Sequence, residues 1–400
     1  MRRGYVVWRG HHQEIEIITK NNIFTMNFTI NSGTLYSQLQ TVSRVLLAKN
    51  TMSILNDFLF EIHDNTLQIK ASDSETTMTA KLPLDVCSGD VRVTIEAAWL
   101  LNLLKEFSDQ PLTFEIDTDN FRIQMSSPNG EYQLVGHNGD EYPEMRQMDE
   151  SETNTFLINS QTLLSCINRT LFSTGNDDIR PVMNGIYFDL DTDKGTVVAT
   201  DAHKLVRLVC TSFHADAPVS FILAKKPANI LRNILGRENG DVLVTFDKKN
   251  ILFTTDSLTL VCRQIEGRYP NYNAVIPQNN DRNVVVDRQT LMSAIRRVGV
   301  SANKASNLIK LTISTNQVEL AAQDIEFSIS ARETIPCQYE GEPIQIGFKW
   351  TFLLEILSVM ECEEVMICLA DHARPGLILP LQNAENEDLT MLLMPMMLND

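Results

Sequence analysis

The sequence predicts an α+β protein built from three tandem copies of one domain, each with two helices packed on antiparallel sheets. Two observations carry this prediction: a short motif that recurs at equal spacing, and a helix and strand pattern that recurs with it. The chain has 400 residues, enough for two or three domains of about 100–200 residues each.

The recurring motif has the pattern of a short strand, a polar turn and the start of a helix. It reads FTINSGTL from Phe28, FLINSQTL from Phe156 and VVVDRQTL from Val284, so both steps are 128 residues. Solenoid repeats are much shorter, at about 20–50 residues. The period therefore indicates tandem domains.

Each motif continues into a helix with one apolar face. Apolar residues recur at i, i+4 and i+7 or i+8, the spacing of a buried stripe. The stripes are Leu35/Leu39/Val42, Leu163/Ile167/Leu171 and Leu291/Ile295/Val298. We expect Ser32, Ser160 and Asp287 to cap these helices, because short oxygen-bearing side chains satisfy the first backbone N–H groups.

Alternating strands, a second helix and a closing hairpin follow in each copy. We expect the second helices at about residues 97–107, 227–235 and 350–360. The predicted domains are residues 26–148, 152–275 and 281–398, joined by polar linkers. Residues 1–25 lack the apolar core and cleavage site of a signal peptide, so we expect a disordered extension or a start upstream of the true one, Met26.

The composition argues against several classes of protein. No run approaches the ~18–20 apolar residues of a membrane span. The seven cysteines are scattered and never spaced CxxC, which argues against a disulfide framework or zinc site and for the reducing cytoplasm. Motifs for nucleophilic catalysis, phosphate binding and metal ligation are missing from the sequence. We therefore expect no cofactor and no enzyme activity.

An enzyme hypothesis would rest on Asp201 and His203. A histidine base needs an adjacent nucleophile and an orienting third group. Asp73 and Asp324 recur at the positions equivalent to Asp201, but without a histidine. This recurrence favours a structural turn for the aspartate.

The net charge of −17 is at first sight unfavourable for binding nucleic acid. However, basic residues gather in or beside the predicted helices: Arg44, Lys49, Lys105, Arg169, Lys225, Lys226, Arg232, Arg237, Arg288, Arg296, Arg297, Lys304 and Lys349. Arg169 and Arg297 occupy equivalent positions, two residues past a buried isoleucine. This spacing is expected to turn them ~200° from the buried face. Basic helices in an acidic body would attract a polyanion; ordinary solvated helices, or a protein scaffold without nucleic acid, are the alternatives.

Four separated motifs resemble the bacterial DNA polymerase III beta subunits, the beta sliding clamps. They are MNGIYF from Met183, ATDAHKL from Ala199, EGRYPNYNAVIP from Glu266 and LMPMML from Leu393. The resemblance covers about Met26 to Leu398, in order and at compatible spacings.

The resemblance implies three DNA-clamp domains per chain and a head-to-tail homodimer that closes as a ring around double-stranded DNA, independently of base sequence. Twelve helices would line the hole. Such a ring confers processivity on the replicative polymerase. The implied partners are the DNA polymerase catalytic subunit, the clamp loader and repair proteins with the same docking motif, with no membrane, metal or catalytic residues.

The family also implies a hydrophobic pocket for partner peptides between the second and third domains. By position its walls are Met183, Thr200, Ala202, His203, Lys204, Leu205, Pro270, Val275, Phe352, Leu392, Leu393, Met394, Pro395, Met396 and Leu398. Flexible methionines suit several related peptides. Ala202 replaces a common glycine, Lys204 an arginine, and Met397 a frequent basic residue.

The expected DNA contacts come from two sources. The resemblance implies Lys49, Arg180, Lys225 and Lys226. The charge pattern of the repeat adds Arg169 and Arg297.

Overall fold

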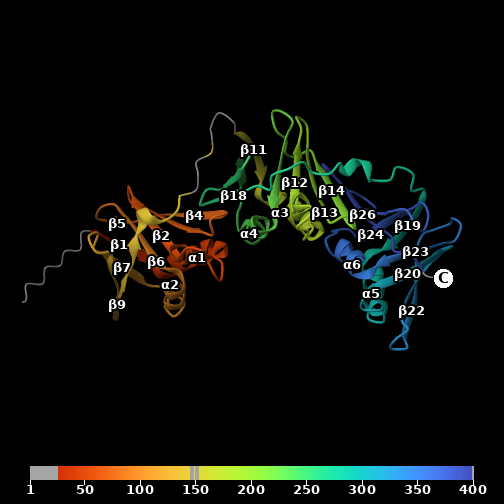
Figure 1. Ribbon diagram of the computed structural model, residues 1–400, viewed down its shortest axis with the longest axis horizontal. Coiled ribbons are helices and arrows are strands. Elements are labelled where there is room, and N and C mark those ends of the chain that lie inside the picture. The colour runs from red at the N-terminus through yellow and green to blue at the C-terminus, as the bar shows by residue number, and fades with distance from the viewer. Residues whose placement is uncertain (1–25, 145–147, 149–152, 399–400) are drawn as a thin grey trace, which may run out of the picture.

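A computed structural model describes residues 26–144, 148 and 153–398. The expected disordered extension, residues 1–25, lies outside the described residues. Figure 1 shows three similar units along an arc, in chain order. Helices α2, α4, α5 and α6 lie toward its concave side, and strands β9 and β22 lie near its two ends.

The three units repeat one order of elements, as the sequence predicted. The first contains β1 (Met26–Asn31), α1 (Ser32–Val42), β2 (Asp57–His63), β3 (Thr66–Ser72), β4 (Thr76–Pro83), β5 (Val86–Cys87), β6 (Val91–Glu96), α2 (Ala97–Leu104), β7 (Pro111–Ile116), β8 (Arg122–Ser127), β9 (Gly130–Val135) and β10 (His137–Asn138). The second contains β11 (Asn154–Asn159), α3 (Ser160–Thr170), β12 (Gly185–Leu190), β13 (Gly195–Thr200), β14 (Lys204–Cys210), β15 (Val219–Ala224), α4 (Lys225–Leu235), β16 (Asp241–Phe246), β17 (Asn250–Thr254) and β18 (Leu258–Arg263). The third contains β19 (Arg282–Asp287), α5 (Arg288–Gly299), β20 (Leu308–Ser314), β21 (Gln317–Asp324), β22 (Ile329–Pro336), β23 (Ile344–Lys349), α6 (Trp350–Ser358), β24 (Glu364–Leu369), β25 (Gly376–Pro380) and β26 (Glu387–Leu393).

All nine residues of the three predicted apolar stripes are buried. They pack against the sheets as part of one large core. Eight of the nine lie in the α-helices themselves, whereas Leu171 lies in a 3₁₀ turn just after α3. The second helices are confirmed, although α2 ends at Leu104 and α6 at Ser358, before the predicted ends.

Two of the three expected helix caps are wrong by one residue. Asn31 and Asn159 are the N-caps, and their side-chain oxygens accept N–H bonds from Gly33 and Gln161. The asparagine backbone is extended, which lets its oxygen reach the exposed N–H groups. Ser32 and Ser160 are the first helical residues; their hydroxyls donate instead to the carbonyls of Ser108 and Glu238. The Asp287 cap is confirmed, accepting from Thr290 N–H at 2.7 Å.

Antiparallel sheets run across both unit boundaries. In the nine-stranded sheet, β4 of the first unit pairs with β18 of the second. In the eight-stranded sheet, β14 of the second unit pairs with β26 of the third. Strands β9 and β22 are each at the edge of a sheet within their own unit. The unit junctions therefore consist of continuous backbone hydrogen bonding.

Ion pairs between units reinforce these junctions. Lys226 of α4 forms an ion pair with Asp73 of the first unit and donates to the Val45 carbonyl at 2.5 Å. Arg169 of α3 forms an ion pair with Glu387 of β26. The side chain of Arg169 is only 11% exposed, so it is not part of an exposed basic surface as its position on the helix suggested. The reason is that the third unit covers this side of α3.

We predict that Lys226→Met lowers stability by about 1–3 kcal/mol, because the buried Asp73 carboxylate loses its charged partner. Adding Asp73→Asn should recover much of the loss, since the amide keeps the turn and removes the charge. Thermal unfolding measures both effects. Lys225→Met, at the same helix terminus, is the matched control, and an equal loss in the control would contradict the role of the junction pair.

Candidate functional site

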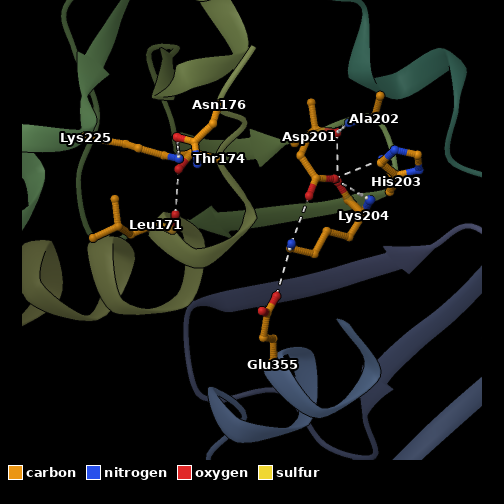
Figure 2. Close-up of polar contacts among 10 residues, drawn as sticks. Leu171, Thr174, Asn176, Asp201, Ala202, His203, Lys204, Lys225 and Glu355 are labelled. Carbon is orange, nitrogen blue, oxygen red and sulfur yellow. Dashed lines mark hydrogen bonds and ion pairs between the residues drawn. The ribbon is translucent and has the colours of Figure 1, made fainter. Parts of the chain in front are cut away.

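The turn between β13 and β14 is built around Asp201. Its Oδ1 accepts the N–H groups of His203 at 2.9 Å and Lys204 at 2.8 Å (Figure 2). The Thr200 hydroxyl donates to the Lys204 carbonyl at 2.8 Å. Asp73 and Asp324 accept backbone N–H bonds in the same way at the equivalent turns. The turn role predicted for these aspartates is confirmed.

Ala202 occupies the left-handed backbone region at the tip of this turn, with φ of 74°. An L-residue with a Cβ is disfavoured there by roughly 1–2 kcal/mol, whereas glycine is not. This conformation would suit the glycine that the family resemblance implies at this position. The side chains of Ala202 and His203 are exposed.

Lys204 lies beneath the turn and links two units. Its Nζ is 2.9 Å from Asp201 Oδ2 and 3.1 Å from Glu355 Oε2 of α6 (Figure 2). It also lies 3.9 Å from the centre of the Phe352 ring, a cation–π contact. Lys204 is 4% exposed, so its charge is satisfied inside the junction. Lys204 therefore connects the turn to α6 of the third unit.

A small apolar cluster, separate from the main core, lies above the sheet at this junction. Its buried members are Val198, Leu205, Ile222, Tyr269, Ile276, Cys368, Leu377 and Leu392. They come from both units and from the linker between them. The sequence predicted only Leu205 and Leu392 of this set. The strand pattern could have suggested Val198 and Leu377, but only the fold brings them together.

The remaining expected pocket residues divide by exposure. Met183, Thr200 and Leu393 are buried. Phe352, Pro395, Met396 and Leu398 are partly exposed, while Pro270, Val275 and Met394 are exposed. The segment after β26 is fixed by two backbone bonds of 2.8 Å, from Met394 N–H to the His203 carbonyl and from Met396 N–H to the Gly347 carbonyl. A methionine-rich edge thus lies beside an apolar floor.

Three tyrosines that the sequence did not predict belong to this cluster or pack against it. The rings of Tyr187 and Tyr269 stack with centroids 4.6 Å apart and an interplanar angle of 4°. The Tyr272 hydroxyl donates to Asp189 Oδ2 at 2.8 Å. Burial raises the pKa of Tyr269 well above its usual range, so the hydroxyl remains neutral at physiological pH. The linker motif EGRYPNY was the available signal for Tyr269 and Tyr272.

The expected DNA contacts are not equally available. Lys49 is exposed. Arg180 pairs with Asp177 at 2.9 Å, Lys225 donates to Asn176 Oδ1 at 2.6 Å, and Arg297 pairs with Glu333. Burial lowers the pKa of Lys225. Arg169 and Lys226 are held in the junctions, so the basic surface is smaller than the sequence suggested.

The described residues contain no group of three or more His, Cys, Asp or Glu side chains arranged to hold a metal ion. Within the same residues, no helix has the length and apolar character needed to cross a membrane.

Three family models match the chain in succession. They describe the N-terminal, central and C-terminal domains of the DNA polymerase III beta subunit, and match residues 26–146, 157–271 and 273–397. Together the matches cover most of the chain.

Curated proteins and solved structures agree with these models. The beta sliding clamp of Haemophilus influenzae is 29% identical over 378 residues, covering 93% of this chain and 100% of that protein. That of Pseudomonas putida is 27% identical with the same coverage. A sliding clamp structure from Bartonella birtlesii, bound to griselimycin, is 27% identical, with a TM-score of 0.86 and coverage of 93% and 100%. The chain belongs to the DNA polymerase III beta subunit family, the DNA sliding clamps of bacterial replication.

Proposed function

We propose that two copies of this chain close head to tail into a ring around duplex DNA and tether the replicative polymerase to it. The chain acts in the cytoplasm as a processivity factor and not as an enzyme. The domains of the ring are residues 26–148, 152–275 and 281–398. The observation that carries the proposal is the pair of open sheet edges, β9 and β22, at the ends of the arc.

These two edges are the repeat equivalents of strands that already pair within the chain. Strands β4, β14 and β22 each follow the Asp turn of their unit, and β18, β26 and β9 each form the last strand of a hairpin. Because β4 pairs with β18 and β14 with β26, β22 should pair with β9 of a second copy. A heterologous contact of this kind closes into a ring when the rotation permits.

The register of the new junction follows from the two existing ones. In these, Met78 faces Leu260 and Val206 faces Met391. In each unit, a residue of the recurring motif can be followed across three successive strand pairings to the residue aligned with it on the last strand. These aligned pairs are Phe156 and Leu260, Val284 and Met391, and, in the first unit, Phe28 and Tyr132. On strand β22, which is equivalent to β4 and β14, the residue equivalent to Met78 and Val206 is Ala331. Tyr132 should therefore face Ala331 of the second copy.

This register is chemically complementary. It places Glu131 opposite Arg332, and Leu134 opposite Ile329, of the second copy. Opposite charges and apolar pairs on facing strands stabilise a sheet by about 0.2–1 kcal/mol each. Exposed apolar residues are present at both edges, with Val135 66% exposed and Phe327 65% exposed. Both would be covered on closure.

DNA would pass through the concave side of the ring, where helices lie (Figure 1). Of the expected contacts, Lys49, Arg180, Lys225 and Arg297 are at least partly exposed and, unlike Arg169 and Lys226, do not form an ion pair across a unit junction. Weak phosphate contacts are sufficient if the ring encloses the duplex, and such contacts do not depend on base sequence. This arrangement accounts for DNA binding by a chain of net charge −17.

We further propose that the apolar floor and methionine edge at the second junction bind a short hydrophobic segment of the polymerase, the clamp loader and repair proteins. The floor is formed by Leu205, Leu377 and Leu392, and the edge by Met394 and Met396. Methionine side chains adapt to differently shaped partners. A scaffold without DNA would use the same pocket, so DNA retention separates the two hypotheses.

The ring junction is tested by cross-linking. With Glu131→Cys and Arg332→Cys in one chain, a short bismaleimide should produce covalent dimers well above the level from the seven native cysteines. Each single variant is the matched control. Efficient linking in the single variants, or none in the double variant, would argue against the derived register.

Encirclement is tested by the shape of the DNA. After loading by the clamp loader of the same organism, the protein should remain on nicked circular DNA through gel filtration and leave linear DNA of the same length, because a ring slides off free ends. Blocking both ends with bound protein should restore retention. Equal retention on circular and open linear DNA would refute the ring.

The pocket is tested by removing its edge. Deletion of Met394–Leu398 should weaken binding of a polymerase-derived peptide at least about tenfold, as expected from the loss of several buried apolar side chains. Fluorescence anisotropy measures the affinity, and light scattering checks that the dimer persists. Unchanged peptide affinity would exclude this site.

A further inference from the structure

A hollow of about 430 Å³ lies at the edge of β15, beside the proposed peptide site. Its lining includes Tyr187, Ser220, Ile222, Asp247, Ile265 and Glu266. Three of these, Tyr187, Ile222 and Ile265, also belong to or pack against the apolar cluster. The hollow therefore shares lining residues with the apolar cluster of the proposed peptide site.

The repeat shows what occupies the equivalent position in the first unit. Ser220 faces Asp189 across the sheet, just as Arg92 faces Glu61 in the first unit. The Arg92 guanidinium lies 2.8 Å from Glu61, 3.2 Å from Asp140 and 3.1 Å from Glu144. Its side chain is only 27% exposed. In the first unit, the position equivalent to the hollow is thus occupied by the side chain of Arg92.

The second unit keeps an acidic residue at the position of Glu61, namely Asp189, but lacks that basic side chain. Ser220 is too short to occupy the position of the Arg92 guanidinium. The hollow has two carboxylates, Asp247 and Glu266, against the single ammonium of Lys248. Glu266 is exposed and has no hydrogen bond or ion pair within residues 26–144, 148 and 153–398. The local charge is therefore negative, and an acceptor is available.

We propose that this hollow binds an arginine or lysine side chain from the residues that flank the hydrophobic motif of a docked partner peptide. This inference rests on the proposed peptide site. The aliphatic stem would lie against Ile222 and Ile265, as the stems of long basic residues commonly do on apolar surface. The charged head would pair with Glu266. The partner would thereby supply the cation that Arg92 supplies in the first unit.

Peptides that differ in one residue test the proposal. The core peptide is the hydrophobic docking segment of the replicative polymerase from the same organism, lengthened at either end by a Gly-Ser spacer. The spacer ends in arginine or, in the matched peptide, in glutamine. With the spacer at one of the two ends, the arginine peptide should bind about three- to tenfold more tightly than the glutamine peptide, as expected for a partly exposed ion pair. This difference in affinity should shrink at high salt.

Protein variants locate the effect. Ser220→Arg places in the second unit the side chain found in the first, and should abolish the preference for arginine while leaving the affinity for the glutamine peptide unchanged. Glu266→Gln should reduce the preference, whereas Asp193→Asn, at an exposed carboxylate in the turn after β12, should preserve it. A second Ser220 variant, Ser220→Lys, guards against a folding defect of the first.

The outcomes distinguish the two proposals. Equal affinities of the arginine and glutamine peptides from both ends would overturn the cation site and leave the hydrophobic pocket intact. A preference that persists in both Ser220 variants would also overturn it, by locating the cation elsewhere. Failure of the core peptide to bind the wild-type chain would overturn the pocket, and the cation site with it.

Discussion

Antiparallel pairing of strands across unit boundaries is the constraint on which the rest of this structure depends. Each unit presents edge strands whose N–H and C=O groups need partners. Pairing β4 with β18 and β14 with β26 satisfies them and fixes the orientation of neighbouring units. The ion pairs at the junctions and the proposed peptide site follow from that orientation. The same constraint leaves β9 and β22 each at the open edge of a sheet, where the proposed second copy would pair.

Equivalent positions at the two junctions share a backbone and differ in chemistry. Leu205 and Val198 in the apolar floor correspond to Thr77 and Lys70 at the first junction. Lys70 there forms an ion pair with Glu61. The first junction is therefore lined by polar groups that remain favourably hydrated, and removing them from water would be costly. Of the two junctions within the described residues, the second has the apolar cluster that suits the proposed hydrophobic segment.

The basic residues of the chain have two different roles, which its net charge does not reveal. Lys204, Arg169 and Lys226 stabilise contacts between units, since each has a carboxylate from a neighbouring unit as partner. Other basic residues remain exposed near the helices. Because a buried ion without its partner is strongly destabilising, the junction residues are constrained together with their partners. The exposed ones need only preserve a positive potential.

The sequence by itself determined the repeat, the order of helices and strands, the buried stripes and the Asp turns. These depend on local periodicity and on short-range backbone bonding, which adjacent residues specify. Family membership was also visible in four motifs. The family resemblance indicated Leu205, Leu392 and the methionine edge of the site, but not that Val198 and Leu377 join them, because strand alternation alone does not say which strands meet.

Only the tertiary structure decided which basic residues are exposed to solvent and which form ion pairs between units. Arg169 and Glu387 are 218 residues apart, and Lys226 and Asp73 are 153 apart. A charge on a helix face looks the same in sequence whether solvent or another unit lies opposite. Strand pairing between units places those carboxylates there, and this long-range pairing has no period that the sequence displays.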